Sequence, residues 1–519
     1  MNALAIILVV AAIGYGISRW LRLPVIPLLL FAGIGLSFLG LLPKGEFAMD
    51  AFVLGLAFLM FTAGMELNPK RFRRQLKAVL WVGLLQFGLV AGCGFLVAQF
   101  LNFDVITCVY LAIALSTSST LVVVNHLKRQ HQMFEPFGRL VIGVLLIQDL
   151  LMILIIVILS RWPEGSMAVG KGLASALALG GLALGCQRWL MPFLIVKMKL
   201  DEESLLLAVL ALLFAFTGIA FNLDLPPVAG AFLAGFALAN FPVNGVVRGL
   251  LLSLSDFFQA IFFTTIGSLI IWPDTIVLAK AGMLALVVLL ITPPLVALVA
   301  EWTGLSSRAA VESGLLLAQT SEFALVLGLT GSQLLDQISP EILSVIALVT
   351  VATMTLTPFI ATDRFTTFLL HFHPLRRRLK PEGMHRGHIL MLGFGAGGMW
   401  VIKPLRQQGH DVLVVDDDPV VIEQLQKMNM PCLRGDGSDE KILTRAGAAH
   451  AKLILASMRR VSEAERVIQH VRGVPVVVRV FEDSDANHIR KLGGIPILNS
   501  SAASETFMEW FDKTFAPAR

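Results

Sequence analysis

The stretch Gly143-Val-Leu-Leu-Ile-Gln148-Asp149-Leu-Leu-Met-Ile-Leu-Ile-Ile-Val-Ile-Leu159 decides the fold class of this chain. It is almost wholly apolar, and with its flanks at 138–160 it is long enough to cross a lipid bilayer as a helix. In its middle lie the carboxylate of Asp149 and the amide of Gln148. A charged side chain at membrane depth costs at least about 2.5 kcal/mol on insertion scales, and such residues mark functional sites by default. Asp149 is therefore the first candidate for a functional residue.

Composition places the whole chain among membrane proteins with many spans. The 519 residues are 56% hydrophobic and only 15% charged, which is not the composition of a soluble enzyme. The formal net charge of +5 is better explained by basic loops than by nucleic-acid binding, so no nucleic-acid partner is expected. Four scattered cysteines predict neither a disulfide framework nor a metal site. The first apolar run lacks a basic start and is interpreted as a membrane helix, not a signal peptide.

Residues 1–361 are predicted to form an all-α membrane domain. With about 20 apolar residues per span, they divide into about thirteen helices. The spans run near 2–20, 24–42, 50–67, 77–100, 104–126, 138–160, 168–196, 203–221, 225–242, 247–271, 275–300, 306–331 and 340–361. Basic loops such as 70–74 follow odd-numbered spans, and acidic or neutral loops follow even-numbered ones, with Lys44 and Arg161 as exceptions. The positive-inside rule then predicts a multi-pass inner-membrane protein with its N-terminus outside and its C-terminal domain in the cytoplasm.

The chain changes character after residue 361. Residues 362–387 are basic and have no apolar run, which is typical of a cytoplasmic linker that could also touch anionic membrane lipid. In residues 388–519, short apolar runs alternate with helical stretches. Strands are predicted at 389–392, 412–415, 432–433, 453–455, 476–478 and near 495. This alternation predicts an α/β, Rossmann-like domain with a doubly wound parallel sheet.

Polar residues interrupt the middle spans of both halves of the membrane domain. The fifth span contains the hydroxyl run 116–120, and the twelfth contains Gln319-Thr-Ser-Glu322. Hydroxyl groups can satisfy the backbone where a membrane helix is broken. Corresponding interruptions in two halves indicate an inverted-repeat transporter with two broken crossing helices and a site near the midplane. The candidate residues for binding a proton or a dehydrated monovalent cation are Asp149, Gln148, Ser116, Thr117, Ser118, Ser119, Thr120, Ser321 and Glu322, with the cation at Asp149.

Simpler interpretations of these polar residues stay open. The hydroxyl residues can merely let helices pack closely, as small residues do in membranes. Glu66 ends span three beside Asn68, Pro69 and a basic cluster, and it is interpreted as an interfacial ion-pairing group.

A glycine cluster marks a second candidate site. Gly393-x-Gly395-x-x-Gly398 follows a predicted strand and opens a helix, and Asp416 ends the next strand. This is the context of a dinucleotide fingerprint, with glycines against the pyrophosphate and the acid on the ribose. The candidate residues for binding NAD(H) or an adenine nucleotide (AMP, ADP or ATP) are Gly393, Phe394, Gly395, Gly398, Asp416 and Asp436. For Asp436, capping of the following helix is the alternative.

Together these residues resemble the monovalent cation:proton antiporter-2 family, in particular its Kef-type potassium/proton antiporters with a regulator-of-potassium-conductance (RCK) N-terminal domain. The stretches that carry the resemblance are Leu59–Leu67, Ser116–Thr120, Ile147–Asp149, Ala229–Gly235, Ser321–Ala324, Gly393–Gly395, Val415–Pro419, Gly435–Asp436 and Ala446–Ala448. The resemblance implies thirteen helices, a core domain moving against a dimerisation domain, and a homodimer. It implies that Asp149 binds K⁺ or Na⁺ in exchange for H⁺, with helix crossings at 116–120 and 320–322.

Departures from the family pattern refine this expectation. Electrogenic relatives have a second acidic residue where Gln148 stands and a lysine nearby in the core, and span eleven has no mid-span Lys or Arg. In lacking both charged residues, the chain resembles the electroneutral branch of the family, and this resemblance implies electroneutral exchange that favours K⁺. Residues 245–253 lack the acidic loop of glutathione-gated relatives, so glutathione gating stays open. Residue 519 ends the sequence without a second RCK-type subdomain, and regulation by an accessory subunit stays open as well.

The sequence thus predicts a K⁺ (or Na⁺)/H⁺ antiporter of the cytoplasmic membrane, regulated by nucleotide binding, and not an enzyme. Two alternatives belong to other classes. A nucleotide-gated cation channel would be favoured by a selectivity-filter sequence such as TVGYG, which the chain lacks. A membrane-tethered dehydrogenase would need a His or Tyr/Lys catalytic set beside the glycine cluster, and none is evident.

Overall fold

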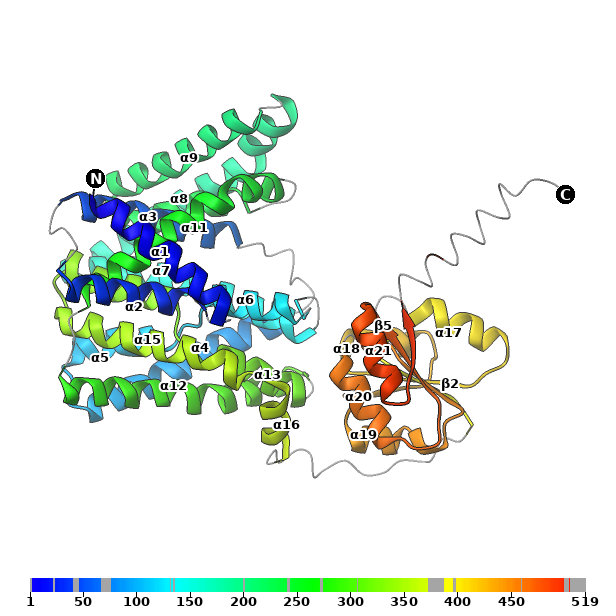
Figure 1. Cartoon of the computed structure of the whole chain (residues 1–519). Helices are drawn as coiled ribbons and strands as arrows, with labels where there is room; N and C mark the ends of the chain where they lie inside the picture. Colours follow the sequence, from blue (N-terminus) through cyan, green and yellow to red (C-terminus); the bar gives the residue numbers. More distant parts are fainter. Residues whose placement is uncertain are drawn as a thin grey trace. The chain divides into compact units, whose positions relative to one another are not determined.

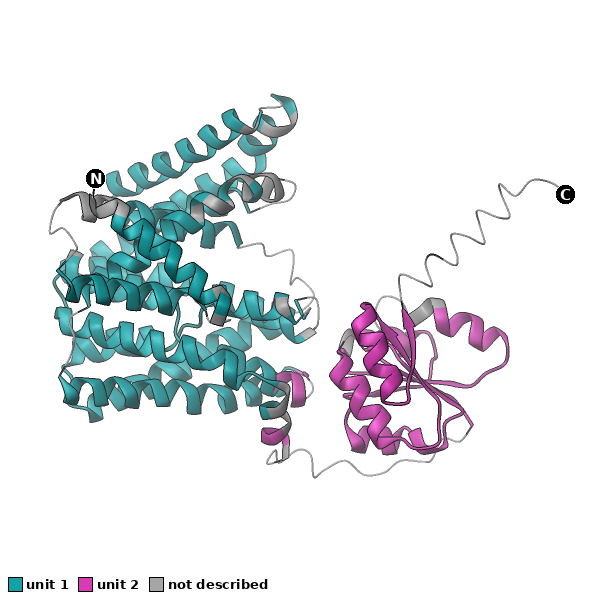
Figure 2. Ribbon diagram, viewed as in Figure 1, with its two compact units in different colours: residues 1–303, 311–366 teal, residues 304–310, 367–519 magenta. Residues whose placement is uncertain are grey.

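The computed structural model describes residues 2–21, 24–40, 46–66, 76–130, 132–133, 136–198, 201–239, 243–270, 274–305, 307–371, 387–394, 398–458, 460–498 and 504. The chain forms two compact units, shown in different colours in Figure 2. Unit 1 contains Met1–Thr303 and Val311–Thr366, and unit 2 contains Gly304–Ala310 and Thr367–Arg519.

Helices make up the membrane domain, as predicted (Figure 1). They are α1 (Asn2–Leu21), α2 (Val25–Phe38), α3 (Glu46–Glu66), α4 (Leu76–Phe100), α5 (Val105–Leu115), α6 (Thr120–Arg129), α7 (Pro136–Arg161), α8 (Ser166–Gly185), α9 (Glu202–Asn222), α10 (Pro227–Phe236), α11 (Val243–Leu269), α12 (Thr275–Trp302), α13 (Ser307–Leu317), α14 (Glu322–Leu329) and α15 (Pro340–Ile360). Each predicted span coincides with one of these helices or, for the fifth and twelfth spans, with a pair.

Two predicted spans are short in the structure. Among the described residues, eight helices or helix pairs are long and apolar enough to cross a membrane, whereas the apolar helices α2 and α10 have only 14 and 10 residues. Of these two, α10 starts only at Pro227, later than the predicted 225. Proline is favoured in the first turn of a helix, because its missing N–H is unpaired there anyway. The pair Pro226-Pro227 therefore sets the start of α10.

The membrane helices pack into two bundles. The core bundle contains α4, α5, α6, α7, α12, α14 and α15, and the panel bundle contains α1, α2, α3, α9, α10 and α11. Helix α8 contacts α7 of the core bundle and both α9 and α10 of the panel bundle. The family resemblance implies a core domain and a dimerisation domain, and the assignment of these two bundles to them stays a prediction.

Both crossing helices are broken, which confirms the prediction drawn from their polar interruptions. Helix α5 ends at Leu115, and α6 begins at Thr120 after Ser119, whose hydroxyl accepts the N–H of Val122. Helix α13 ends at Leu317, and α14 begins at Glu322 after Ser321, whose hydroxyl accepts an N–H from its first turn. A serine at each break thus takes up one of the N–H groups that a helix start leaves unpaired.

Unit 2 contains a parallel sheet of six strands in the order β3-β2-β1-β4-β5-β6. The strands are β1 (Ile389–Leu392), β2 (Val412–Asp416), β3 (Cys432–Arg434), β4 (Leu453–Ala456), β5 (Val476–Val480) and β6 (Ile495–Leu498). The helices are α17 (Gly398–Gln407), α18 (Pro419–Lys427), α19 (Glu440–Arg445), α20 (Val461–His470) and α21 (Asp483–Lys491). Strand order reverses between β1 and β4, so the predicted doubly wound, Rossmann-like fold is confirmed.

The predicted linker at 362–387 is not wholly irregular. Its first part forms the short helix α16 (Asp363–His371), and residues 372–386 lie outside the described residues. Sequence reasoning missed α16 because the helix is amphipathic and short, with no apolar run.

Candidate functional site

Two glutamine side chains hold the unwound segment of the first crossing. The Gln148 carbonyl oxygen accepts the N–H of Ser118 at 3.1 Å, and its Nε2 donates to the backbone oxygen of Ser116 at 3.4 Å. The Gln148 amide also donates to Gln86 of α4, and the Gln86 amide donates to the same Ser116 oxygen. All four residues are buried, so these bonds replace the helix bonds that the break removes.

Asp149 has one satisfied and one unsatisfied oxygen. The hydroxyl of Thr120, the first residue of α6, donates to Oδ2 at 3.0 Å. The other oxygen, Oδ1, is buried without a donor among the described residues, and the side chain as a whole is 1% exposed. A buried carboxylate oxygen without a partner is costly unless a proton or a cation occupies it.

The second crossing brings another acid to Asp149. Glu322 opens α14, is 3% exposed, and lies close enough to Asp149 for electrostatic interaction. Its carboxyl also interacts with the Ser119 side chain and the Leu121 backbone at the start of α6. The Ser118 hydroxyl donates to the Leu317 oxygen, the last carbonyl of α13, at 2.8 Å. The two unwound segments therefore contact each other around Asp149.

Three buried oxygens of Asp149 and of the second crossing lack a hydrogen-bond donor among the described residues. They are Asp149 Oδ1, Gln319 Oε1 and Glu322 Oε2, and all three side chains are buried. Helix α7 contributes the Asp149 oxygen, and the second crossing contributes the oxygens of Gln319 and Glu322. Oxygen ligands of this kind replace the hydration shell of a monovalent cation.

Threonines of α15 hold the second crossing. The Thr353 hydroxyl accepts the N–H of Thr320 at 3.1 Å, and the Thr320 hydroxyl bonds to that of Thr350 at 3.0 Å. The Thr357 hydroxyl lies 3.1 Å from the freed oxygen of Ala318 and 2.8 Å from the Thr353 oxygen of its own helix, and it can donate to either. Sequence reasoning missed these threonines and Gln86, because each is a single polar residue in an apolar span. Only the threonine spacing of three and four residues, typical of one helix face, could have indicated α15.

The remaining predicted residues of the membrane site serve the helix ends. The Ser116 and Thr117 hydroxyls donate back to the oxygens of Ile113 and Ala114 at the end of α5. Ser119 and Ser321 cap α6 and α14. The hydroxyl run therefore does more than allow close packing, because it satisfies the backbone groups that the break frees.

Charged residues also occur around the core. Glu66, at the end of α3, interacts electrostatically with both Asp149 and Glu322, and its interpretation as an interfacial ion-pairing group stays a prediction. Lys280 of α12 lies with its Nζ 4.4 Å from the centre of the Phe103 ring. No group of three His, Cys, Asp or Glu side chains that could hold a metal ion occurs in the described ranges.

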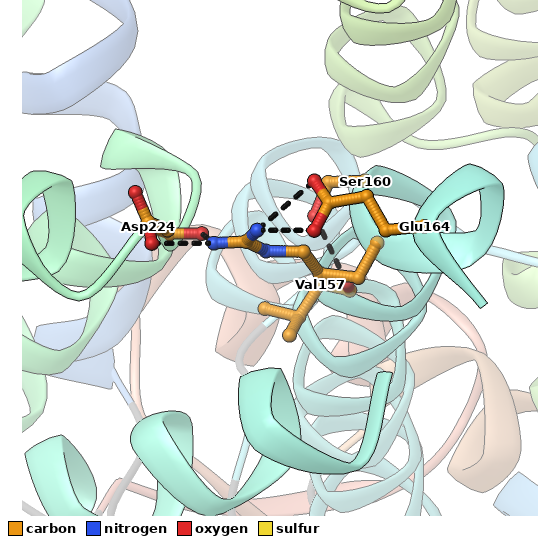
Figure 3. Close-up of polar contacts among 5 residues, drawn as sticks. Val157, Ser160, Glu164 and Asp224 are labelled. Atoms are coloured by element: carbon orange, nitrogen blue, oxygen red, sulfur yellow. Dashed lines mark hydrogen bonds and ion pairs between the residues drawn. The ribbon is translucent and has the colours of Figure 1, made fainter. Parts of the chain in front are cut away.

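Arg161, an exception to the charge pattern, forms an ion-pair cluster at the end of α7. Its guanidinium donates to both carboxylate oxygens of Glu164, at 3.0 and 2.8 Å. It also contacts the backbone oxygen of Asp224 and lies 3.4 Å from the carboxylate of that residue. Figure 3 shows Glu164 and Asp224 on opposite sides of the guanidinium. Asp224 lies in the turn between α9 and α10, so Arg161 links the core bundle to the panel bundle.

The candidate nucleotide site lies at the carboxyl ends of β1 and β2. Gly393 follows β1 with a φ of +79°, and an added Cβ would lie 3.3 Å from the Met458 nitrogen. The carboxylate of Asp416 accepts the N–H of Phe394 at 2.7 Å and that of Asp418 at 2.8 Å. Asp416 thus holds the glycine turn in place.

The other residues predicted for this site differ in how far the structure describes them. Gly398 is the first residue of α17, and Gly395 lies outside the described residues. Asp436 accepts the N–H and the hydroxyl of Ser438 at 2.8 Å each and pairs with Arg308 at 3.8 Å, both in unit 2. The capping alternative for Asp436 is wrong, because Asp439 caps α19 by accepting the N–H of Lys441.

Comparison with known proteins gives two family matches and several relatives. A model of the transmembrane sodium/hydrogen exchanger matches residues 5–362, and a model of the TrkA-N domain matches residues 389–499. The putative K(+) efflux antiporter KefB of Alkalimonas amylolytica is 25% identical over 86% of this chain and 70% of that protein. The glutathione-regulated potassium-efflux system protein KefC of Salmonella typhimurium is 27% identical over 85% of this chain and 73% of that protein.

Several solved structures are similar to the C-terminal part. Among them, the TrkA-N domain of the inner membrane protein ybaL from Escherichia coli is 17% identical, covering 24% of this chain and 97% of that chain with a TM-score of 0.23.

Proposed function

The chain belongs to the sodium/hydrogen exchanger family, and we propose that it is a secondary transporter that exchanges K⁺, or less favourably Na⁺, for H⁺ across the cytoplasmic membrane. Two relatives of similar architecture are named as potassium efflux proteins, which supports K⁺ as the cation. The basic loops and the positive-inside rule support a C-terminal domain in the cytoplasm.

The observation that carries this proposal is the buried carboxylate oxygen of Asp149 that has no hydrogen-bond donor. Its Oδ1 is buried without a donor among the described residues, and Glu322, which interacts with Asp149 electrostatically, also has a buried oxygen without one. Such a group needs a positive partner, and a proton and a dehydrated cation are the two that fit a site made of oxygens. Because both occupy the same carboxylate, the site carries either one or the other. Competition of this kind is the physical basis of exchange.

Gln148 supports an electroneutral cycle. It is a neutral amide beside Asp149, and its hydrogen bonds are spent on Gln86, Ser116 and Ser118. The pair 148–149 therefore contains a single titratable group, which favours one proton for each cation. Alternating access would expose this group to one side of the membrane and then to the other by motion of the core bundle against the panel bundle.

The TrkA-N domain would regulate this exchange through a bound NAD(H) or adenine nucleotide. The glycine turn at Gly393, held by Asp416, supports a pyrophosphate at the start of α17, since a helix N-terminus attracts anions. Enclosing NADH or AMP in proteoliposomes that contain the protein would reveal such regulation as a change in exchange rate.

Replacement of Asp149 tests the proposal directly. In proteoliposomes, Asp149→Asn should abolish K⁺-driven proton movement, because the amide can neither release a proton nor neutralise a cation. Asp336→Asn is the control, since Asp336 is exposed and its φ of +49° suits asparagine. Exchange that persists in Asp149→Asn would refute the proposal. K⁺ flux without counter-movement of protons in the unaltered protein would indicate a channel instead.

A further inference from the structure

Three threonines of α15 lie along one face of the helix and contact the unwound segment of the second crossing. Thr350, Thr353 and Thr357 are buried and are spaced by three and four residues. Their partners are Thr320 and Ala318 at the end of α13, in the segment that leads to Glu322. We call these residues the threonine ladder.

The hydroxyl hydrogens of Thr350 and Thr353 can be assigned one by one. The Thr350 hydroxyl donates to the Ile346 oxygen at 2.8 Å, and the Thr353 hydroxyl donates to the Val349 oxygen at 2.8 Å. A hydroxyl has only one hydrogen, so neither can donate to Thr320 as well. The hydrogen in the contacts between Thr320 and the ladder must therefore come from the Thr320 hydroxyl, at 3.0 Å from Thr350 or 3.2 Å from Thr353.

This assignment fixes what the Thr320 hydroxyl can offer elsewhere. Its hydrogen is committed to α15, and within the described residues no ladder group returns a hydrogen to its oxygen. The oxygen can then act only as an acceptor. An acceptor without a competing hydrogen is suited to a cation, in the same way as the backbone oxygens of an ion site. Gln319, the neighbour of Thr320, contributes one of the three unsatisfied oxygens.

We propose that Thr350 and Thr353 are positioning residues for cation binding, which orient the Thr320 hydroxyl so that its oxygen serves as a cation ligand beside Asp149. This inference rests on the proposed exchange function, and it adds Thr320 and its ladder to the site. The two crossings are then held by different chemistry. Gln86 and Gln148 hold the first through amides, and hydroxyls hold the second.

Isosteric substitutions test the ladder. Thr353→Val and Thr350→Val keep the shape of the side chain but remove the hydroxyl. Each should raise the KM for K⁺ in proteoliposomes by about three- to tenfold, the effect of one hydrogen bond, with a smaller change in maximal rate. The pH dependence should stay unchanged, because no titratable group is lost. Thr353→Ser and Thr350→Ser should restore the KM.

The matched control is Thr355→Val on the same helix. The Thr355 hydroxyl donates to the Val351 oxygen of its own helix at 2.6 Å and is partly buried. Loss of this bond should leave the KM unchanged. A KM for K⁺ that is equal in Thr353→Val, Thr350→Val and Thr355→Val would overturn the inference, and so would a failure of serine to restore it.

The outcomes also separate this inference from the proposed function. If Asp149→Asn abolishes exchange while the valine variants transport normally, only the ladder inference fails. If Asp149→Asn still exchanges K⁺ for H⁺, the proposed function itself fails. Thermal unfolding of each variant in detergent shows whether it is folded, and Thr350→Val keeps the test valid if Thr353→Val does not fold.

Discussion

At the scale of single residues, Gln86 bonds to Gln148, and the two amides together hold the unwound segment of the first crossing. The Gln86 amide accepts from Gln148 and donates to the Ser116 oxygen, and Gln86 is 1% exposed. Gln86→Leu should lower the free energy of unfolding by about 1–3 kcal/mol, because it leaves buried polar groups without partners. Thermal unfolding in detergent would measure this effect.

Gln99→Leu provides the control for this prediction. Gln99 lies in the same helix, α4, but its side chain is exposed, so leucine there should be close to neutral. Equal stability of the two variants would show that the amide pair does not hold the first crossing.

The same residues explain what could be predicted from the sequence. Asp149 was found because a carboxylate inside an apolar span is costly, whatever surrounds it. Gln86 was missed because a lone neutral glutamine costs much less in an apolar span than a carboxylate does. Its role depends on which residue the folded chain places beside it. The α15 threonines were missed for the same reason, since threonine can bond to its own helix and needs no explanation there.

At the scale of helices, two glycines let α3 and α10 pack closely in the panel bundle. A Cβ on Gly64 would overlap the Phe232 oxygen, and a Cβ on Gly235 would overlap the Phe61 oxygen. Both stretches were recognised from the sequence, but their contact was not, because no local pattern says which helices face each other. Small residues at such contacts are common in membranes, where close backbone approach replaces the hydrophobic driving force.

Gly235→Ala should therefore separate α3 from α10 and lower the unfolding temperature. The methyl group meets backbone rather than a flexible side chain, so the cost resembles overpacking, about 1–3 kcal/mol. Gly218→Ala is the control, because a Cβ at Gly218 of the neighbouring helix α9 meets no atom within 4 Å. Alanine should be neutral or slightly stabilising there. An unchanged unfolding temperature in Gly235→Ala would contradict the close contact.

At the scale of the whole molecule, the helices and strands could be predicted from the sequence, but the packing of the membrane helices into two bundles could not. The positions of the helices, both broken helices and the six strands followed from apolar runs and from the polar interruptions. The division into two bundles came only from the resemblance, since it depends on contacts far apart in sequence. Arg161 shows this limit clearly. In the sequence it only broke the charge pattern, whereas in the structure it connects the bundles.

The Arg161 cluster leads to a prediction about alternating access. Asp224 lies between α9 and α10 of the panel bundle, whereas Glu164 follows directly after α7 of the core bundle. If the bundles move against each other, the pair with Asp224 must break, but the pair with Glu164 travels with Arg161. Asp224→Asn should therefore speed exchange by up to about fivefold, within the roughly 1 kcal/mol expected of an exposed pair. Glu164→Gln should change the exchange rate less.

A double-mutant cycle in proteoliposomes measures this difference. Arg161→Gln should also raise the rate, and Asp224→Asn should add nothing to it, because the same contact is already lost. High salt should reduce the effect of Asp224→Asn, since it screens exposed charges. Additive effects of Arg161→Gln and Asp224→Asn, or a larger effect from Glu164→Gln, would mean that the cluster fixes the end of α7 rather than restraining one bundle against the other.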